Sequence, residues 1–179
     1  KHATLGGVCL NVGCIPSKAL LHVAKVINEA DEMSHHGVSF GKPNLDIDKI
    51  REFKSGVVGK LTKGLDGLAK QRKVEKIQGM AKFTSPYTIE IDTAEGKKVV
   101  RFKNASIAPG SHSFKVTGFP FDAPRVIDST RALLLESVPE KMLVVGGGII
   151  GLEMAEVYGT LGSKITVVEL GDGLIPGAD

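Results

Sequence analysis

The chain has 179 residues, 42% hydrophobic and 24% charged, which is typical of a globular protein that buries a core. Its 23 basic and 20 acidic residues leave a formal net charge of only +3, which does not favour nucleic acid or a membrane surface as a partner. No apolar stretch is expected to span a membrane, and two cysteines are too few for a secreted disulfide scaffold.

The N-terminal part of the chain predicts an irregular segment followed by two helices. Residues 1–13 contain glycines and show no apolar period, so we expect them to be irregular. From Cys14 apolar residues recur at helical spacing, which predicts a helix that fades near Met33. A second helix is predicted from about residue 46 or 48 to about Lys73, with four glycines inside it.

After Lys73 the apolar period changes from helical to alternating. Short strands are expected at 74–77, 88–91, 99–102 and 105–108. The turn at 92–96 is expected to join the second and third of these strands as a hairpin. Prolines and glycines punctuate residues 112–140, which predicts a connector between domains with a short helix at 129–135.

The last part of the chain predicts the first half of a doubly wound sheet. A strand, a helix and a second strand are expected at 142–145, 149–161 and 165–169. Between the first strand and the helix, Gly146, Gly148 and Gly151 satisfy G-x-G-x-x-G in the context that a dinucleotide-binding turn requires.

Each part of this motif has a physical reason. Gly146 permits a tight turn, Gly148 lets the backbone approach a pyrophosphate, and Gly151 lets the helix pack closely on the strand. The helix N-terminus offers N–H groups and a positive dipole to the phosphates. Glu169 ends the second strand, where a carboxylate would accept hydrogen bonds from ribose hydroxyls and favour NAD over NADP. The alternatives are a turn that binds nothing and a turn that binds the ADP half of FAD.

The two cysteines form a close pair. Four residues separate Cys9 from Cys14, and Gly13 eases closure between them. Cys14 opens a predicted helix whose dipole favours the thiolate, and such a pair can attack a disulfide and then close its own bond. Lys18 adds a positive charge one helical turn further on. Two unrelated buried thiols, a structural disulfide and a zinc site are the alternatives, although the histidines show no ligand spacing.

The segment GGVCLNVGCIPSKALL, residues 6–21, resembles the active-site segment of the flavin-dependent pyridine nucleotide-disulfide oxidoreductases. Leu10, Ile15 and residues 17–21 are more similar to the dihydrolipoamide dehydrogenase branch of that family than to its glutathione or mercuric reductases. The resemblance continues through 146–155 to 176–179. It implies an α/β fold in three parts. These are a partial FAD-binding domain over 1–111, a connector over 112–140, and the first half of a Rossmann-type NAD-binding domain over 141–179.

The resemblance also implies roles for single residues. Cys9 would be the interchange thiol that reacts with lipoamide, and Cys14 would face the flavin and form the charge-transfer thiolate. Lys18 would lie near the flavin N5 and pair with Glu153. Further cofactor contacts are implied at Gly79, Ala81, Pro109, Gly110 and Ser111 for FAD, and at Gly146, Gly147, Gly148, Ile149, Ile150, Gly151 and Glu169 for NAD.

The activity implied is oxidation of protein-bound dihydrolipoamide with NAD⁺, through a Cys9–Cys14 disulfide and FAD. The expected partners are lipoyl domains of 2-oxo acid dehydrogenase complexes and a second subunit of a homodimer, in a bacterial cytoplasm or a mitochondrial matrix. The family's first FAD glycine turn and its dimerisation domain match no part of this chain, so we expect it to be catalytically incomplete by itself. The alternatives are a mercuric or glutathione-type reductase and a non-catalytic binding or antigenic module.

Overall fold

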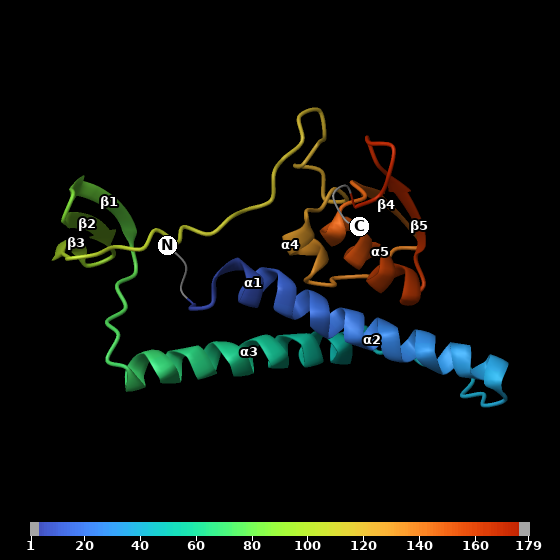
Figure 1. Cartoon of the computed structure of the whole chain (residues 1–179). Coiled ribbons are helices and arrows are strands. Elements are labelled where there is room, and N and C mark those ends of the chain that lie inside the picture. The colour runs from blue at the N-terminus through green and yellow to red at the C-terminus, as the bar shows by residue number, and fades with distance from the viewer. Residues whose placement is uncertain (1–3, 176–179) are drawn as a thin grey trace.

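The chain folds into a helical part, a small sheet and a β-α-β unit (Figure 1). This computed structural model describes residues 4–175, so the end of the family resemblance at 176–179 lies outside it. The helical part contains α1 (Gly7–Val12), α2 (Cys14–Glu32), η1 (Met33–His36) and α3 (Ile47–Gln71). The sheet contains β1 (Met80–Ser85), β2 (Thr88–Thr93) and β3 (Gly96–Arg101). The connector and the β-α-β unit contain α4 (Ser129–Ala132), β4 (Lys141–Val145), α5 (Ile149–Thr160) and β5 (Lys164–Val168).

Helices α2 and α3 lie where the helical period predicts them and pack against each other. Asp46 caps α3 by accepting a hydrogen bond from the Lys49 N–H at 3.1 Å. The four interior glycines of α3 face open space, since a Cβ at any of them would meet no atom within 4 Å. They weaken the helix, and the cap and the packing against α2 offset that cost.

Lys54 ties α3 to the connector. Its side chain is buried, and its ammonium donates a hydrogen bond to the Leu133 carbonyl at 2.7 Å, just beyond α4. Burial lowers the pKa of Lys54, and the positive charge of Arg51 lowers it further. The contact therefore holds the short helix α4 at the place where the chain enters the β-α-β unit. The helix predicted at 129–135 is present, but it is shorter than expected.

The expectation that residues 1–13 are irregular is wrong, because Gly7–Val12 forms helix α1. Gly6 precedes it with φ 107°, a conformation that favours glycine. The Asn11 amide donates to the Leu5 and Gly7 carbonyls at 3.1 and 2.9 Å. A helix of six residues spans fewer than two turns, so its apolar residues show no period that the sequence could reveal.

The three strands β1, β2 and β3 form an antiparallel sheet in that order. The pairing of Thr93 with Gly96 confirms the predicted hairpin. The strands predicted at 74–77 and 105–108 are wrong, and β1 was not expected. Every residue of β1 is exposed, and its sequence, MAKFTS, does not alternate apolar with polar residues throughout. Pairing with β2 is what defines it as a strand. The two segments predicted wrongly have alternating residues but no strand beside them.

The β-α-β unit is confirmed in full. Strands β4 and β5 are parallel, with Lys141 opposite Lys164 and Val145 opposite Val168. Helix α5 packs against both strands and against α2, where the main core of the described chain lies. This core gathers residues from α2, α4 and α5 and the segments that follow the last two: Leu20, Ala132, Leu133, Leu135, Met154, Val157, Tyr158 and Leu161. Helix α2, which begins at Cys14 and is called the redox helix below, and α5, which follows the glycine motif and is called the nucleotide helix, therefore share one apolar interface.

One helical run in the described residues, Gly7–His36, is long and apolar enough by length and composition to cross a membrane. Its most apolar 18-residue window has a mean hydropathy of 1.3. The core helix of a globular protein can pass the same test, and α2 buries Leu20 and Ala24 to 1% exposure. A single run of this kind is weak support for a membrane span.

Candidate functional site

The two cysteines lie on consecutive helices and come into contact. Cys9 is inside α1 and Cys14 opens α2, and both are free, exposed thiols. Gly13 joins the helices so closely that a Cβ on it would lie 3.1 Å from the Cys9 Cα. The two thiols are near enough for Cys9 to raise the pKa of Cys14. Their exposure and proximity disfavour the alternative of two unrelated buried thiols.

A zinc site has no ligand set in the described chain. Across residues 4–175, no group of three or more histidine, cysteine, aspartate or glutamate side chains is placed to hold a metal ion. Within the described residues, Cys9 and Cys14 therefore form a thiol pair and not part of a metal site. The charged residues Lys18 of α2 and Glu153 of α5 form an ion pair on the same helices.

The pKa of Cys14 is raised, although the helix dipole predicts that it is lowered. The largest cause is the hydrogen bond with Cys9, followed by partial desolvation and the charge of Cys9. The Glu153 carboxylate also raises it, while a hydrogen bond with the backbone lowers it. The expectation that the helix dipole lowers the pKa of Cys14 is therefore wrong for this dithiol, because the neighbouring thiol and carboxylate outweigh the helix N-terminus. The thiolate that Cys14 is expected to form beside FAD stays a prediction.

A carboxylate on the nucleotide helix contacts the redox helix directly. The Ser17 hydroxyl donates to Glu153 Oε2 at 2.6 Å, and the Lys18 ammonium lies 3.7 Å from Glu153 Oε1. The ion pair between Lys18 and Glu153 is the one expected from the family resemblance. The contact of Ser17 was not expected, since nothing in the sequence marks a serine as the partner of a residue 136 positions away.

The glycine turn between β4 and α5 has the geometry that its motif predicts. Gly146 has φ 110° and donates its N–H to the Val168 carbonyl at 2.8 Å. A Cβ on Gly151 would lie 2.2 Å from the Gly146 carbonyl oxygen, so only glycine allows this approach of helix to strand. A Cβ on Gly148 would meet no atom within 4 Å, so its backbone faces open space. Helix α5 begins there without a side-chain cap.

Glu169 lies at the turn, as expected, and already holds two backbone groups. Its Oε1 accepts from the Gly171 N–H at 2.9 Å, and its Oε2 accepts from the Gly147 N–H at 2.6 Å. These bonds, that of Gly171 first, lower the pKa of Glu169. A carboxylate has about four acceptor positions, so the bonds to Gly147 and Gly171 leave capacity for the hydroxyls of a ribose. The Ile175 N–H also donates to the Gly147 carbonyl at 3.0 Å, which folds residues 171–175 over the turn.

The structure brings only some of the expected FAD contacts near the cysteines. Gly110 has φ 76°, and a Cβ on it would lie 3.7 Å from Val8 Cγ2, so the loop 109–111 passes beside α1. Gly79 and Ala81 lie at β1, in the sheet that Figure 1 shows apart from α1. A Cβ on Gly79 would lie 2.3 Å from the Asp92 carbonyl oxygen, so the sheet itself requires glycine there.

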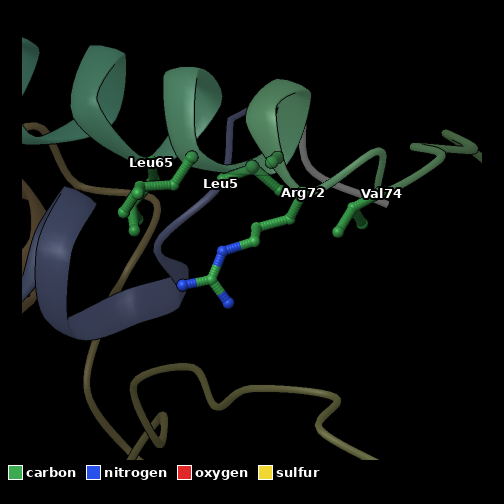
Figure 2. A pocket seen from close by; sticks show the side chains of 6 residues that line it. Leu5, Leu65, Arg72 and Val74 are labelled. Atoms are coloured by element: carbon green, nitrogen blue, oxygen red, sulfur yellow. The ribbon is translucent and has the colours of Figure 1, made fainter.

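A pocket near the start of α1 is lined by none of the site residues described above. It has a volume of about 380 Å³ and lies between Leu5 and the C-terminal end of α3 (Figure 2). Its lining is mainly apolar, with one guanidinium: Leu5, Leu65, Leu68, Ala69, Arg72 and Val74. None of the expected cofactor or redox residues lines it.

Gly151 and Gly148 give a matched pair for a stability test. Gly151→Ala in the full-length protein is expected to destabilise the fold by about 1–3 kcal/mol, because its methyl group would overlap the Gly146 carbonyl. Gly148→Ala, whose methyl group meets open space, is expected to change stability by less than about 0.5 kcal/mol. Urea unfolding measures both. Equal destabilisation by the two variants would contradict the packing role of Gly151.

The lowered pKa of Glu169 predicts an acid-sensitive turn. A carboxylate whose folded-state pKa lies below its unfolded value stabilises the fold above the unfolded pKa, and this is lost as pH falls through the folded pKa. The bonds to Gly147 and Gly171 are therefore expected to be intact at neutral pH and to break together below the usual pKa of glutamate. Amide NMR shifts of isotope-labelled glycine test this, with Gly162, whose N–H bonds a backbone carbonyl, as control. Independent titration of the two amides would contradict it.

Comparison with known proteins gives one consistent result. The family profile described as "Pyridine nucleotide-disulphide oxidoreductase" matches residues 2–179. The chain is 60% identical to the dihydrolipoyl dehydrogenase of Vibrio cholerae, over 100% of this chain and 38% of that protein. It is 43% identical to a leghemoglobin reductase of Vigna unguiculata, over 100% of this chain and 35% of that protein.

A solved structure has the same fold. The HOCl-induced flavoprotein disulfide reductase RclA from Escherichia coli matches with a TM-score of 0.80 and 28% identity, over 100% of this chain and 37% of that one. The α/β fold expected from the sequence is thereby confirmed. The chain spans 38% of the length of the Vibrio cholerae relative, so the match covers well under half of that protein.

Proposed function

Because this chain belongs to the pyridine nucleotide-disulphide oxidoreductase family, we propose that it is part of a dihydrolipoyl dehydrogenase that oxidises protein-bound dihydrolipoamide with NAD⁺. One observation carries the proposal. Gly13 brings Cys9 of α1 close to Cys14 at the start of α2, and α2 contacts the nucleotide helix through the Ser17–Glu153 hydrogen bond. A dithiol and a dinucleotide turn are thus linked within one core.

The residues at the glycine turn fit the pyrophosphate of NAD. The uncapped N-terminus of α5 offers N–H groups, and Gly148 leaves open space for the phosphates to approach. Residues 146–151, which include Gly147, Ile149 and Ile150, would hold the pyrophosphate. Glu169 would bind the ribose through the acceptor positions that Gly147 and Gly171 leave available. Its negative charge would repel the 2′-phosphate of NADP.

The residues beside the cysteines fit one side of a flavin. Cys14 would face the ring, and Lys18, held by Glu153, would place a positive charge beside it. The loop of Pro109, Gly110 and Ser111 would border the same space, although Pro109 has no N–H to donate. Gly79 and Ala81 are proposed FAD contacts on the family resemblance alone. When bound, FAD supplies the two-electron carrier between the dithiol and NAD⁺.

The thiol chemistry of this chain follows from disulfide exchange. With Cys9 and Cys14 joined as a disulfide, a substrate thiolate attacks the Cys9 sulfur, forms a mixed disulfide and releases Cys14 as a thiolate. The second substrate thiol then attacks the substrate sulfur of that mixed disulfide, which releases Cys9 and leaves the substrate oxidised. Two electrons now reside on the Cys9–Cys14 dithiol. Return of these electrons to NAD⁺ would restore the disulfide, and the balanced overall reaction would be dihydrolipoamide + NAD⁺ to lipoamide, NADH and a proton.

The partners proposed are lipoyl domains of 2-oxo acid dehydrogenase complexes, and a second subunit in a homodimer. The relatives named dihydrolipoyl dehydrogenase include bacterial and mitochondrial proteins, which supports a location in the bacterial cytoplasm or the mitochondrial matrix.

Substrate choice tests the proposal against the other branches of the family. The full-length protein is expected to oxidise NADH with lipoamide as the electron acceptor. The rate with lipoamide is expected to be at least about a hundredfold higher than with oxidised glutathione or mercuric ion, because a site shaped for one acceptor disfavours acceptors of another shape. Absorbance of NADH measures all three rates. A flavoprotein that prefers glutathione or mercuric ion would reject lipoamide as the substrate, and a colourless protein without flavin would favour a binding module.

A further inference from the structure

Ser17 is the most buried polar side chain at the interface of the redox helix and the nucleotide helix. It is 4% exposed, and its hydroxyl donates to Glu153 Oε2 at 2.6 Å. The other oxygen of the same carboxylate, Oε1, lies 3.7 Å from the Lys18 ammonium. The two oxygens of Glu153 are therefore directed to two consecutive residues of α2.

The hydroxyl of Ser17 is the better of the two groups to fix the Glu153 carboxylate. A hydroxyl donating to a charged oxygen forms a short, strong bond, and burial keeps water from competing for it. The Lys18 side chain is 74% exposed and has a flexible four-carbon stem, so its ammonium alone would hold the carboxylate loosely. Fixing one oxygen on Ser17 sets the plane of the carboxylate and hence the position of the other oxygen.

We propose that Ser17 is a positioning residue for the redox reaction. Its hydroxyl fixes the Glu153 carboxylate, and Glu153 in turn holds the Lys18 ammonium near the Cys14 end of α2. This inference rests on the proposed function, since it assigns Lys18 to the flavin side of the same site. Without the hydroxyl, Glu153 turns freely and Lys18 loses its fixed place.

The same pair of helices provides a matched control. Further along α2, the Asn28 amide donates to Glu156 Oε1 at 2.7 Å and to the Thr160 hydroxyl at 3.2 Å. Asn28 lies eleven residues after Ser17, which is roughly 16 Å along a helix. Asn28→Ala therefore removes a tie between α2 and α5 without touching Glu153 or Lys18.

The test compares Ser17→Ala, Asn28→Ala, Glu153→Gln and the double variant Ser17→Ala/Glu153→Gln in the full-length holoenzyme. Two quantities are measured: kcat per bound flavin with lipoamide and NADH, and the visible absorbance of the two-electron-reduced flavin. Ser17→Ala is expected to lower kcat about tenfold, which is the loss that corresponds to one hydrogen bond to a charged group. It is also expected to change the visible absorbance of the two-electron-reduced flavin. Asn28→Ala is expected to leave both unchanged.

The double variant tests whether Ser17 acts through Glu153. If it does, Ser17→Ala causes little further loss in the Glu153→Gln background, because the carboxylate it fixes is already gone. Additive losses, or a Ser17→Ala enzyme that matches Asn28→Ala in both readouts, would overturn the inference. A wild-type enzyme inactive with lipoamide would instead reject the proposed function, and the flavin absorbance would still decide the role of Ser17.

Discussion

Replacing Cys9 with serine is expected to lower lipoamide turnover by on the order of a thousandfold or more, while FAD stays bound. A serine hydroxyl is a weak nucleophile and cannot form a disulfide with Cys14 or with the substrate. Cys14 would remain beside the flavin, so the long-wavelength charge-transfer absorbance of a thiolate against the ring is expected to persist. Steady-state kinetics and the visible spectrum of the full-length variant measure the two effects.

Cys14→Ser is the matched variant. It removes the other thiol of the same pair, so turnover is expected to fall equally, but the charge-transfer absorbance is expected to disappear as well. The opposite pattern, with the absorbance lost in Cys9→Ser and kept in Cys14→Ser, would show that the roles of the two cysteines are reversed.

Replacing Glu169 with alanine is expected to lower the preference for NAD over NADP by roughly tenfold or more. The alanine variant loses the ribose acceptor and also the negative charge that meets the 2′-phosphate of NADP. It also frees the Gly147 and Gly171 N–H groups that Glu169 holds, so binding of NAD itself should weaken. The ratio of kcat/KM for the two cofactors in the full-length enzyme measures the effect.

Glu169→Gln separates charge from shape. It keeps one acceptor oxygen for the backbone of the turn and removes the charge. The kcat/KM for NADP is therefore expected to rise by a larger factor than the kcat/KM for NAD falls. An unchanged NAD preference in Glu169→Ala would show that Glu169 does not contact the ribose.

The parts of the fold that the sequence predicts are those with a strong local pattern. Helices α2 and α3 have long apolar periods, whereas β4, α5 and β5 are apolar segments arranged around the glycine motif, and the positions of all five are confirmed. The glycine turn is also local, since a positive φ at Gly146 and close contact at Gly151 leave glycine as the one residue that fits. Helix α1 is short and half-buried, and strand β1 is short and exposed, so neither has an apolar pattern that predicts it.

The candidate site is harder to predict where it depends on residues far apart in the chain. The contact of Ser17 with Glu153 and the bonds of Glu169 to Gly147 exist only once α5 packs against α2 and β5 pairs with β4. The prediction for the pKa of Cys14 is wrong for two reasons. The largest opposing group, the Cys9 thiol, is near in sequence but is placed by helix α1, which the sequence did not predict. The Glu153 carboxylate is far away in sequence and comes near only when α5 packs against α2.

The most direct test of the central claim is NAD⁺ reduction by dihydrolipoamide in the intact protein, with reduced glutathione as the control thiol. Cys9 and Cys14 are alkylated before and after the reaction and mapped by mass spectrometry. We expect fast NADH formation with dihydrolipoamide only, and a disulfide between Cys9 and Cys14 that opens when dihydrolipoamide is added without NAD⁺. NADH formation while both thiols stay free and reactive throughout would contradict the claim, because electrons would then reach NAD⁺ without passing through this pair.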